Sequence, residues 1–588
     1  NNNNNNNNNN PPQPPPPPKK RKRERLDKSS RIAIVGSGLA GLSTAISLEL
    51  AGFTNLVLLE RDASLSSRRE GYGLTLTYNP KGPLQHLGVL EDAANLDCPS
   101  RSHYLFRPDG SILGYYGNAF SVKGGAGQRG NIRLPRQLLR RLLVEKVQSP
   151  IIFSKKLVGV EEEDQQSIDG EKVIDIPRLR LVFEDGSLES NVDFLIGADG
   201  IRSSVIKSLF PSDGGLNYLK VFIILGISDF HHSLLDERGF YTLDGNHRLF
   251  TMPYEGCRID DCDKNSKRQR RIMWQLSYQF EDLEEAKHLS SAGSKVLQQE
   301  VLRRCQSWHD PVLQMVHSTP LDTIWGTGLM DRNPAGLTDQ LLSHKNAGRV
   351  ALVGDAIHPM SPFKGQGANQ ALLDGPLLAS WLERASFDAA RKGFLREMMQ
   401  RTRKRVVASR EAAHLLHSKV ILDDEQHGFA GVSRDHISTL LEELKRQKIG
   451  ALQGASLDEK VQHVIEQLGM QSSCEGSKED DPKGHLDEQK QALSMAAEGD
   501  TQGLRNLSIK SGDALKLAKS ANGRSCLHAA VSSGHYNTCR WLLTEALLVD
   551  SADHDGKTAL EVALEKGDEP IIDIFKSFKT LKENHKKS

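Results

Sequence analysis

The stretch RIAIVGSGLAGLSTAISLELAGFTNLVLLE, residues 31–60, decides the fold of this chain. It begins with a short apolar run at 31–35, which predicts a buried strand, and continues with helical periodicity as far as Gly52. A second apolar run at 55–60 predicts another strand. A strand, a tight turn, a helix and a strand form one βαβ unit, which predicts an α/β fold with a doubly wound parallel sheet.

The turn after the first strand has the glycine spacing G-x-G-x-x-G, which is typical of dinucleotide binding. The first glycine permits the tight turn, the second lets a pyrophosphate approach the backbone, and the third lets the helix pack closely on the strand. The helix N-terminus adds free N–H groups and a partial positive charge. An acidic residue at the end of the second strand can accept hydrogen bonds from a ribose. The candidate contacts here are Gly36, Ser37, Gly38, Gly41, Glu60 and Arg61.

A second glycine-rich stretch, GDAIHPMSPFKGQGANQALLDG at 354–375, follows the apolar run RVALV. Its aspartate would stand at the carboxyl end of a strand, where doubly wound folds bind ligands. The segment GQGAN at 365–369 offers close backbone at the N-terminus of the next helix, whose positive end suits the pyrimidine edge of a flavin. A purely structural alternative is that the aspartate caps a helix and the glycines only shape turns. The candidate contacts here are Asp355, Pro362, Gly365, Gly367, Ala368 and Asn369.

Three motifs in this order carry a family resemblance: GSGLAG at 36–41, GADGIRSSV at 197–205, and the stretch at 354–375. Together they resemble the FAD-dependent single-component monooxygenases, which include aromatic hydroxylases, zeaxanthin-type epoxidases and tetracycline-modifying enzymes. The resemblance covers roughly residues 31–400. It implies an FAD-binding domain of the Rossmann type that is interleaved with a mainly β substrate domain.

The resemblance also implies roles for single residues. In that family the first motif binds the ADP half of FAD, and the motif that is Asp199-Gly200 here serves both FAD and reduced nicotinamide. The third motif contacts the ribityl chain, here through Asp355. The segment PRQLLRRLL at 135–143 resembles the family helix R-x-x-L-R-x-x-L, whose first arginine, here Arg136, touches FAD.

The implied reaction uses NAD(P)H and O2 to insert one oxygen atom into an apolar or aromatic small molecule, by hydroxylation or epoxidation, and to reduce the other to water. The family usually has a basic residue where Ile206 stands, with Lys207 following here, so a contact to the nicotinamide phosphate stays open. No residue is assigned as a catalytic acid or base, and His358 is expected to stabilise its turn. The residues expected to form the wall of the flavin site are Pro362, Gly365 and Gly367.

Two rival functions stay open at this point. The first is another flavin oxidoreductase of the same fold, a reductase or a halogenase, although the chain has no W-x-W tryptophan pair. The second is a flavoprotein redox sensor or adaptor that acts through the C-terminal module described next.

The C-terminal segment repeats itself. NGRSCLHAAVSSGH at 522–535 and DGKTALEVALEKGD at 555–568 align at a shift of 33 residues, and SMAAEGDTQGLRNL at 494–507 is a degenerate further copy. This period, with a turn glycine and an apolar–alanine core, resembles ankyrin repeats. We expect an all-α module whose surface contacts a protein partner, with a purely structural cap as the alternative.

These signals predict the following domain order. The predicted segments are an Asn/Pro-rich and basic disordered tail (1–30), the monooxygenase domain (31–400, with substrate-domain segments at about 66–125 and 214–345), a helical extension (401–470), a linker (471–486) and the ankyrin-like repeats (487–588).

Composition narrows the function classes. A net charge of +1 over 588 residues argues against wholesale nucleic-acid binding. No apolar run approaches the ~18 residues of a membrane span, and seven cysteines at scattered spacings indicate reduced thiols in a cytoplasmic setting. The basic run KKRKRER at 19–25 also allows a nuclear location. Because the first residue is asparagine, a targeting segment upstream of it stays open.

Three other patterns are not assigned to a site. The second G-x-G-x-x-G match, at 125–130, has no buried strand before it and is interpreted as a surface loop. Cys257 and Cys262 lie in a polar insert without a histidine partner, so no metal site is predicted. Large aromatic side chains are expected in the core rather than along a substrate cavity; they are Trp274, Trp308 and Trp325.

Overall fold

The computed structural model forms two units, Asn1–Cys474 and Glu475–Ser588, and each is described by itself. The residues that it describes are 25–67, 71–98, 100, 102–117, 131–163, 178–210, 215–236, 238–256, 269–343, 348–422, 438–468, 482–510, 518–520, 522, 524–544, 553, 555 and 557–576. The loop expected at 125–130, both cysteines of the 257–262 insert and most of the 1–30 tail lie outside these residues.

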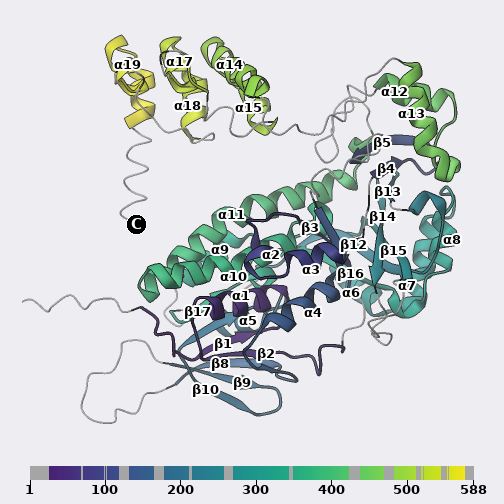
Figure 1. The fold of residues 1–588 in the computed structure, drawn as a ribbon, viewed down its shortest axis with the longest axis vertical. Helices are drawn as coiled ribbons and strands as arrows, with labels where there is room; N and C mark the ends of the chain where they lie inside the picture. Colours follow the sequence, from purple (N-terminus) through teal and green to yellow (C-terminus); the bar gives the residue numbers. More distant parts are fainter. Residues whose placement is uncertain are drawn as a thin grey trace, which may run out of the picture. The chain divides into compact units, whose positions relative to one another are not determined.

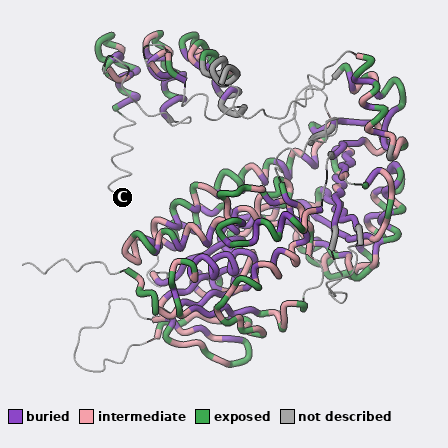
Figure 2. Tube along the Cα trace, in the orientation of Figure 1, coloured by how far each residue is buried: buried purple, intermediate pink, exposed green. Residues whose placement is uncertain are grey.

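A five-stranded parallel sheet forms the centre of the first unit (Figure 1). In spatial order its strands are β17 (Val350–Leu352), β11 (Phe194–Gly197), β1 (Ile32–Val35), β2 (Leu56–Leu59) and β7 (Ile151–Ile152). Every adjacent pair runs parallel. All residues of β1 and β2 are buried (Figure 2), as is usual for a parallel sheet that is covered on both faces. The structure thus confirms the predicted βαβ unit and the α/β fold.

Helices join and cover these strands. They include α1 (Leu39–Leu50), α4 (Arg136–Lys146), α5 (Ser204–Leu209), α9 (Pro334–Ser343), α10 (Gly367–Arg384) and α11 (Phe387–Leu416). A small three-stranded sheet, β8 (Leu157–Glu163), β9 (Arg178–Phe183) and β10 (Leu188–Val192), lies beside them. The boundary expected at residue 400 lies inside α11, which is continuous over 30 residues.

The contact between α1 and α10 depends on a glycine and a serine. A Cβ atom on Gly375 would lie 2.5 Å from the carbonyl oxygen of Ser43, so only glycine lets the two helices approach this closely. The next residue, Pro376, has no N–H to donate to the carbonyl of Leu372, four residues earlier in the same helix. The hydroxyl of Ser43 donates to that carbonyl at 2.9 Å instead. A residue of α1 therefore satisfies the acceptor that the proline would leave unpaired, and α10 continues through it.

A seven-stranded sheet forms the second part of the first unit. Its order is β16 (Trp325–Asp331), β12 (Asn217–Ser228), β15 (Gln269–Gln279), β14 (His247–Gly256), β13 (Arg238–Leu243), β4 (Ser102–Phe106) and β5 (Ile112–Gly117). A two-stranded ribbon, β3 (Gly73–Thr77) and β6 (Asn131–Pro135), connects this part to the parallel sheet domain. Trp274 and Trp308 are buried in the core of this part, as expected, whereas Trp325 is 38% exposed.

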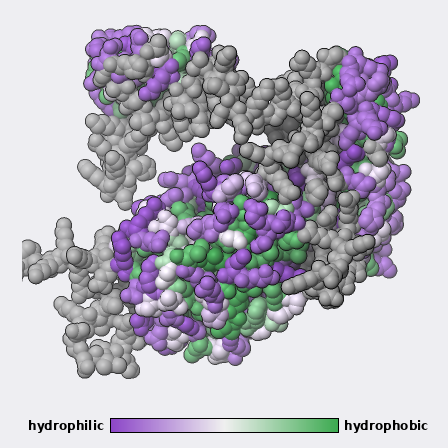
Figure 3. All heavy atoms as spheres, viewed as in Figure 1, coloured by the Kyte–Doolittle hydropathy of each residue, from purple (hydrophilic) through white to green (hydrophobic). Residues whose placement is uncertain are grey.

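Helices close one face of the seven-stranded sheet. They are α6 (Leu283–Ser291), α7 (Ser294–Arg304), α8 (Val312–His317), α12 (Ser438–Arg446) and α13 (Leu457–Gln467). The last two belong to the expected helical extension, and they bury apolar residues such as Leu444 and Val461 against the sheet. Asp458 of α13 also forms an ion pair with Arg238 at 2.7 Å. Hydrophilic residues cover the outer side of these helices (Figure 3).

The second unit contains consecutive short helices: α14 (Pro482–Glu498), α15 (Thr501–Lys510), α17 (Cys526–Ser532), α18 (Tyr536–Thr544) and α19 (Ala559–Lys566). Leu527, Ala530 and Ala563 are fully buried between them. The ring of His528 bonds the carbonyl oxygen of Lys557 at 3.0 Å, which connects one repeat to the next. The predicted helical repeats are therefore present.

We expect Ser43→Ala to lower the free energy of unfolding by ~1–3 kcal/mol, because it leaves the buried carbonyl of Leu372 without a donor. In a Pro376→Ala background the restored backbone N–H takes over, so the same change should cost under ~1 kcal/mol. Urea unfolding of the four variants of this cycle measures the coupling. Ser47→Ala is the control, because its acceptor, the carbonyl of Ser43, keeps its helical N–H partner. Equal costs in both backgrounds would contradict the interpretation.

Candidate functional site

The sheet brings the three sequence motifs together at one edge. β1, β11 and β17 are parallel, so their carboxyl ends meet, and the turns that follow them contain the motifs. A Cβ atom on Gly36 would lie 2.4 Å from the carbonyl oxygen of Ala198, and one on Gly354 would lie 2.6 Å from the Cβ atom of Ala40. Turns that are some 300 residues apart in sequence are therefore in direct contact, as expected for a ligand site at this edge.

The glycines of these turns fall into two groups. Gly36 has φ +104°, and a Cβ atom on Gly41 would lie 1.9 Å from the carbonyl oxygen of Gly36, so these two serve the packing of the protein itself. By contrast, added Cβ atoms on Gly38 and Gly367 would meet nothing closer than 3.5 Å and 3.9 Å. Gly365 has no heavy atom within 4 Å of such a position. These three leave open space at the backbone, which is the space that a ligand would use.

A buried arginine braces the first turn. Nε of Arg140 on α4 donates to the carbonyl oxygen of Ser37 at 2.9 Å, and Nη2 donates to the Ser37 hydroxyl at 2.8 Å. The same guanidinium lies 3.4 Å from Oε2 of Glu60, which also accepts from the N–H and the hydroxyl of Ser37. Burial alone would raise the pKa of the Glu60 carboxyl, but the hydrogen bonds from Asp62 and Ser37 and the charge of Arg140 hold it below 4.5. Glu60 is thus a carboxylate fixed at the fingerprint turn.

Asp355 stands in the turn that follows β17. Surrounding protein raises the pKa of its carboxyl by desolvation, against the charges of His358 and Arg136, yet its side chain is exposed to solvent. The charges of Arg136 and Asp355 both act on the hydroxyl of Tyr72. Nη2 of Arg136 also lies 3.5 Å from the Cβ position of Gly38, so this guanidinium lies beside the first turn and its charge acts on the carboxyl of the last.

Asp199 follows β11, and its Cα atom lies 3.0 Å from the Cβ position of Gly36 in the first turn. Its Oδ2 accepts from the N–H of Ser204 at 2.6 Å and of Val205 at 3.2 Å at the start of α5. Its Oδ1 is buried and has no hydrogen-bond partner among the described residues. Burial raises the pKa of this carboxyl. A buried acceptor without a donor is costly, so this oxygen is a position where a ligand hydroxyl or N–H would be stabilised.

The other predicted contacts have more structural roles. The side-chain NH2 of Asn369 donates to the carbonyl oxygens of Thr75 and Gly365, both at 3.0 Å, and its oxygen accepts from the N–H of Thr77 at 3.0 Å. Its amide therefore ties β3 to the GQGAN turn. Arg61 is exposed after β2, and Ala368 is half-buried in the first turn of α10.

Comparison with known proteins shows which families the two parts of the chain match. Residues 29–214 and 305–411 match the family described as "FAD binding domain", and residues 492–583 match "Ankyrin repeats" in three copies. The chain belongs to the FAD-dependent monooxygenase family. It is 28% identical over 427 residues to monooxygenase cfoF of Aspergillus candidus, which covers 68% of this chain and 95% of that protein.

A further relative and a solved structure resemble the chain over a similar length. Chloroplastic zeaxanthin epoxidase of Solanum lycopersicum is 29% identical over 424 residues, which are 70% of this chain and 55% of that protein. The crystal structure of HpxO from Klebsiella pneumoniae, complexed with FAD and uric acid, matches with a TM-score of 0.51 at 18% identity. It covers 73% of this chain and 96% of that one, and it supports the fold alone.

The residues at this edge of the sheet fit a bound FAD. Open backbone at Gly38, Gly365 and Gly367 provides a cradle that a Cβ atom would fill. The unpartnered oxygen of Asp199 offers an acceptor, and the exposed carboxylate of Asp355 offers another. Together with the N-termini of α1 and α10, this set suits a ligand with a pyrophosphate and several hydroxyl groups.

Sequence reasoning missed three charged residues that support this site. They are Arg140 on α4, Asp374 on α10 and Arg401 on α11. Each is a charged residue on a helix face that is otherwise buried, as in LLRRLL around Arg140 and ALLDGP around Asp374. That pattern could have marked them as paired buried charges, because isolated ones are rarely tolerated.

Among the described residues, no helix combines the length and the apolar character that a membrane span requires. The described residues also contain no group of three or more His, Cys, Asp or Glu side chains placed to hold a metal ion.

We expect Arg140→Met to destabilise the protein by ~3–5 kcal/mol, because it leaves the Glu60 carboxylate buried without its cation. Lys146→Met on the same helix is the matched control. Its ion pair with Asp92, at 3.7 Å, is exposed, so its loss should cost ~0–1 kcal/mol. Urea unfolding followed by tryptophan fluorescence measures both, since most tryptophans lie in the first unit. If both variants lost a similar, small amount of unfolding free energy, the buried Arg140–Glu60 pair would stabilise the protein no more than an exposed pair does.

Proposed function

We propose that this protein is a monooxygenase that uses FAD, NAD(P)H and O2 to hydroxylate or epoxidise an apolar or aromatic small molecule. In the balanced reaction, the substrate, O2, NAD(P)H and one proton give the oxygenated substrate, water and NAD(P)⁺. The observation that carries the proposal is the meeting of the turns at Gly36–Gly41, Asp199 and Asp355 at the carboxyl edge of the parallel sheet.

The arrangement supports the following roles for the chain. The N–H groups at the start of α1, beside Gly38, would bind the pyrophosphate, and Glu60 would accept from the adenosine ribose. Asp355 would accept from the ribityl hydroxyls, and the N-terminus of α10 would face the pyrimidine edge of the flavin. The residues proposed to hold FAD are Gly36, Ser37, Gly38, Gly41, Glu60, Arg61, Arg136, Asp199, Gly200, Asp355, Gly365, Gly367, Ala368 and Asn369, with Pro362 on the wall.

The seven-stranded sheet supplies the apolar surface for a substrate. Leu225, Ile227, Met252, Tyr254 and Met273 form one buried cluster on this sheet. That cluster reaches the cofactor side through β3, because Sδ of Met273 accepts from the N–H of Gly73 at 3.0 Å. Thioether and aromatic groups favour flat, polarisable ligands, which supports an apolar or aromatic substrate.

The residues around this space would orient the substrate and exclude water. When bound, FAD would supply the transfer of two electrons from NAD(P)H to O2. No side chain in the described part of the site is proposed as the acid or base. The relatives include a "Zeaxanthin epoxidase" and a "6-hydroxynicotinate 3-monooxygenase", so their names cover both epoxidation and hydroxylation. Both outcomes therefore remain within the proposal.

We also propose that the C-terminal repeats bind a protein partner, as helical repeats of this kind generally do. We place the protein in a reducing compartment such as the cytoplasm or nucleus, because Cys305, Cys526 and Cys539 are buried free thiols.

Gly38→Val should abolish FAD binding without unfolding the protein. Gly38 has an ordinary φ of −78°, and an added Cβ atom lies 3.5 Å from the nearest atom, so the fold tolerates a side chain that the pyrophosphate does not. Gly41→Ala is the contrasting control, because its Cβ atom would lie 1.9 Å from a backbone oxygen and should destabilise the fold itself. FAD titration and thermal unfolding separate the two effects. Normal FAD affinity in folded Gly38→Val protein would contradict the proposed cofactor path.

Oxygen consumption tests the reaction. We expect purified protein with FAD to oxidise NAD(P)H and take up O2 when a suitable substrate is present, and to form a product that contains one atom from ¹⁸O2. Screening should use aromatic and polyene compounds, with NADPH and NADH in parallel. Substrate reduction without oxygen uptake would favour a reductase. A chain that lacks residues 486–588 should keep this activity and lose only partner binding; a full chain that binds FAD but turns over no compound would favour the adaptor function.

A further inference from the structure

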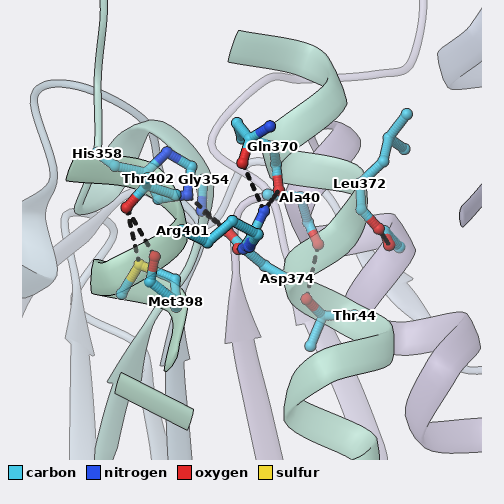
Figure 4. A network of polar contacts seen from close by, with 11 residues as sticks. Ala40, Thr44, Gly354, His358, Gln370, Leu372, Asp374, Met398, Arg401 and Thr402 are labelled. Carbon is cyan, nitrogen blue, oxygen red and sulfur yellow. Dashed lines mark hydrogen bonds and ion pairs between the residues drawn. The ribbon is translucent and has the colours of Figure 1, made fainter. Parts of the chain in front are cut away.

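A buried aspartate lies directly behind the turn that presents Asp355. Asp374 on α10 has an exposed fraction of 0%, and its Oδ2 accepts from the backbone N–H of Gly354 at 2.7 Å. The same oxygen bonds Nε2 of His358 at 2.8 Å (Figure 4). One carboxylate oxygen therefore holds both ends of the five-residue turn from Gly354 to His358.

The backbone closes the same turn from the inside. The carbonyl oxygen of Gly354 accepts from the N–H groups of Ile357 and His358, each at 3.0 Å. Gly354 itself has φ +60°, a conformation that favours glycine. Asp355 lies between these two anchored residues and is exposed, whereas Asp374 is fully buried. The backbone that presents the Asp355 carboxylate is thus held by Asp374 from the interior.

A second charged residue fixes Asp374 from the opposite side. Nη2 of Arg401 on α11 bonds Oδ1 of Asp374, and Nη1 donates to the backbone and side-chain oxygens of Gln370 at 3.1 Å and 2.8 Å. In Figure 4, Arg401 lies between Asp374 and Gln370, with His358 and Gly354 on the same side of Asp374. Asp374 is therefore an acceptor toward every partner that it has.

The charges around Asp374 keep it ionised. Burial would raise the pKa of its carboxyl, but the charges of His358 and Arg401 and its hydrogen bonds hold the pKa below 3.8. The carboxyl of Asp355 also acts electrostatically on this group. A fixed negative charge consequently lies behind the turn that faces the proposed flavin.

We propose that Asp374 is a positioning residue for the flavin: by holding Gly354 and His358 on one oxygen, it fixes Asp355 against the ribityl chain and places a negative charge behind the ring. This inference rests on the proposed FAD site. It assigns both the affinity for FAD and part of the redox potential to a residue outside contact with the cofactor.

Asp374→Asn tests the proposal. The amide keeps the size of the carboxylate, but its NH2 group must face a donor on one side or the other, so one anchor is lost. We expect FAD to bind about tenfold more weakly or worse. We also expect the midpoint potential of the bound flavin to rise, because removing a nearby negative charge stabilises the anionic reduced form. Titration of the apoprotein with FAD and spectroelectrochemistry of the full chain measure these quantities.

Two further variants make the test specific. Thr402→Val removes a hydroxyl that is equally buried, at 0% exposure, in the next position of α11, where it bonds only Met398. It should leave both FAD affinity and potential unchanged. His358→Gln places a donor near the original Nε2 position and should retain FAD affinity, whereas His358→Ala should weaken it. If Asp374→Asn does not fold, the contrast between the two His358 variants decides.

The outcomes are distinguishable. Wild-type affinity and potential in folded Asp374→Asn protein would overturn the positioning role while leaving the FAD site intact. If Thr402→Val changed FAD affinity and potential as much as Asp374→Asn does, the effect would be general destabilisation, and the positioning role would also be overturned. Failure of the wild-type protein to bind FAD would overturn the cofactor site itself, and this inference with it.

Discussion

The close approach of backbone to backbone at the carboxyl edge of the parallel sheet is the constraint on which the structure depends. Gly36 touches Ala198, Gly41 touches Gly36, and Gly354 touches Ala40, each at a distance that no larger side chain allows. Around these contacts, the carboxyl ends of three parallel strands lie at the same edge of the sheet, followed by the turns that lead into α1 and α10. This packing places the exposed carboxylate of Asp355 and the buried, unpartnered oxygen of Asp199 at the same edge of the sheet, so the candidate site is a consequence of the glycine positions.

Local signals made the fold and the centre of the site predictable. The signals that predicted them are local: apolar runs, glycine spacing and strand ends, each within a few residues, at 31–60, 197–205 and 349–375. The structure brings these three segments together, as predicted. The helical repeats were also predictable, because two copies in the sequence align at a shift of 33 residues.

The supporting shell of the site was not predictable in this way. Arg140, Asp374 and Arg401 act through partners that are distant in sequence, so no local pattern identifies what they bind. Asn369 shows the same limit. The sequence predicted a contact with the cofactor, but the side-chain amide of Asn369 forms its hydrogen bonds with β3 and with the turn at Gly365. Tertiary pairing decides the role of such residues, whereas spacing decides only where they stand.

The hydrogen bond from the Ser43 hydroxyl to the Leu372 carbonyl couples substitutions at Ser43 on α1 to substitutions at Pro376 on α10. Because proline left the Leu372 carbonyl without its own helical donor, any lineage that replaces Ser43 first passes through a state with an orphaned acceptor in the interior. A lineage that replaces the proline first does not. Replacing the proline first therefore avoids a destabilised intermediate, which favours retention of the serine wherever the proline is retained.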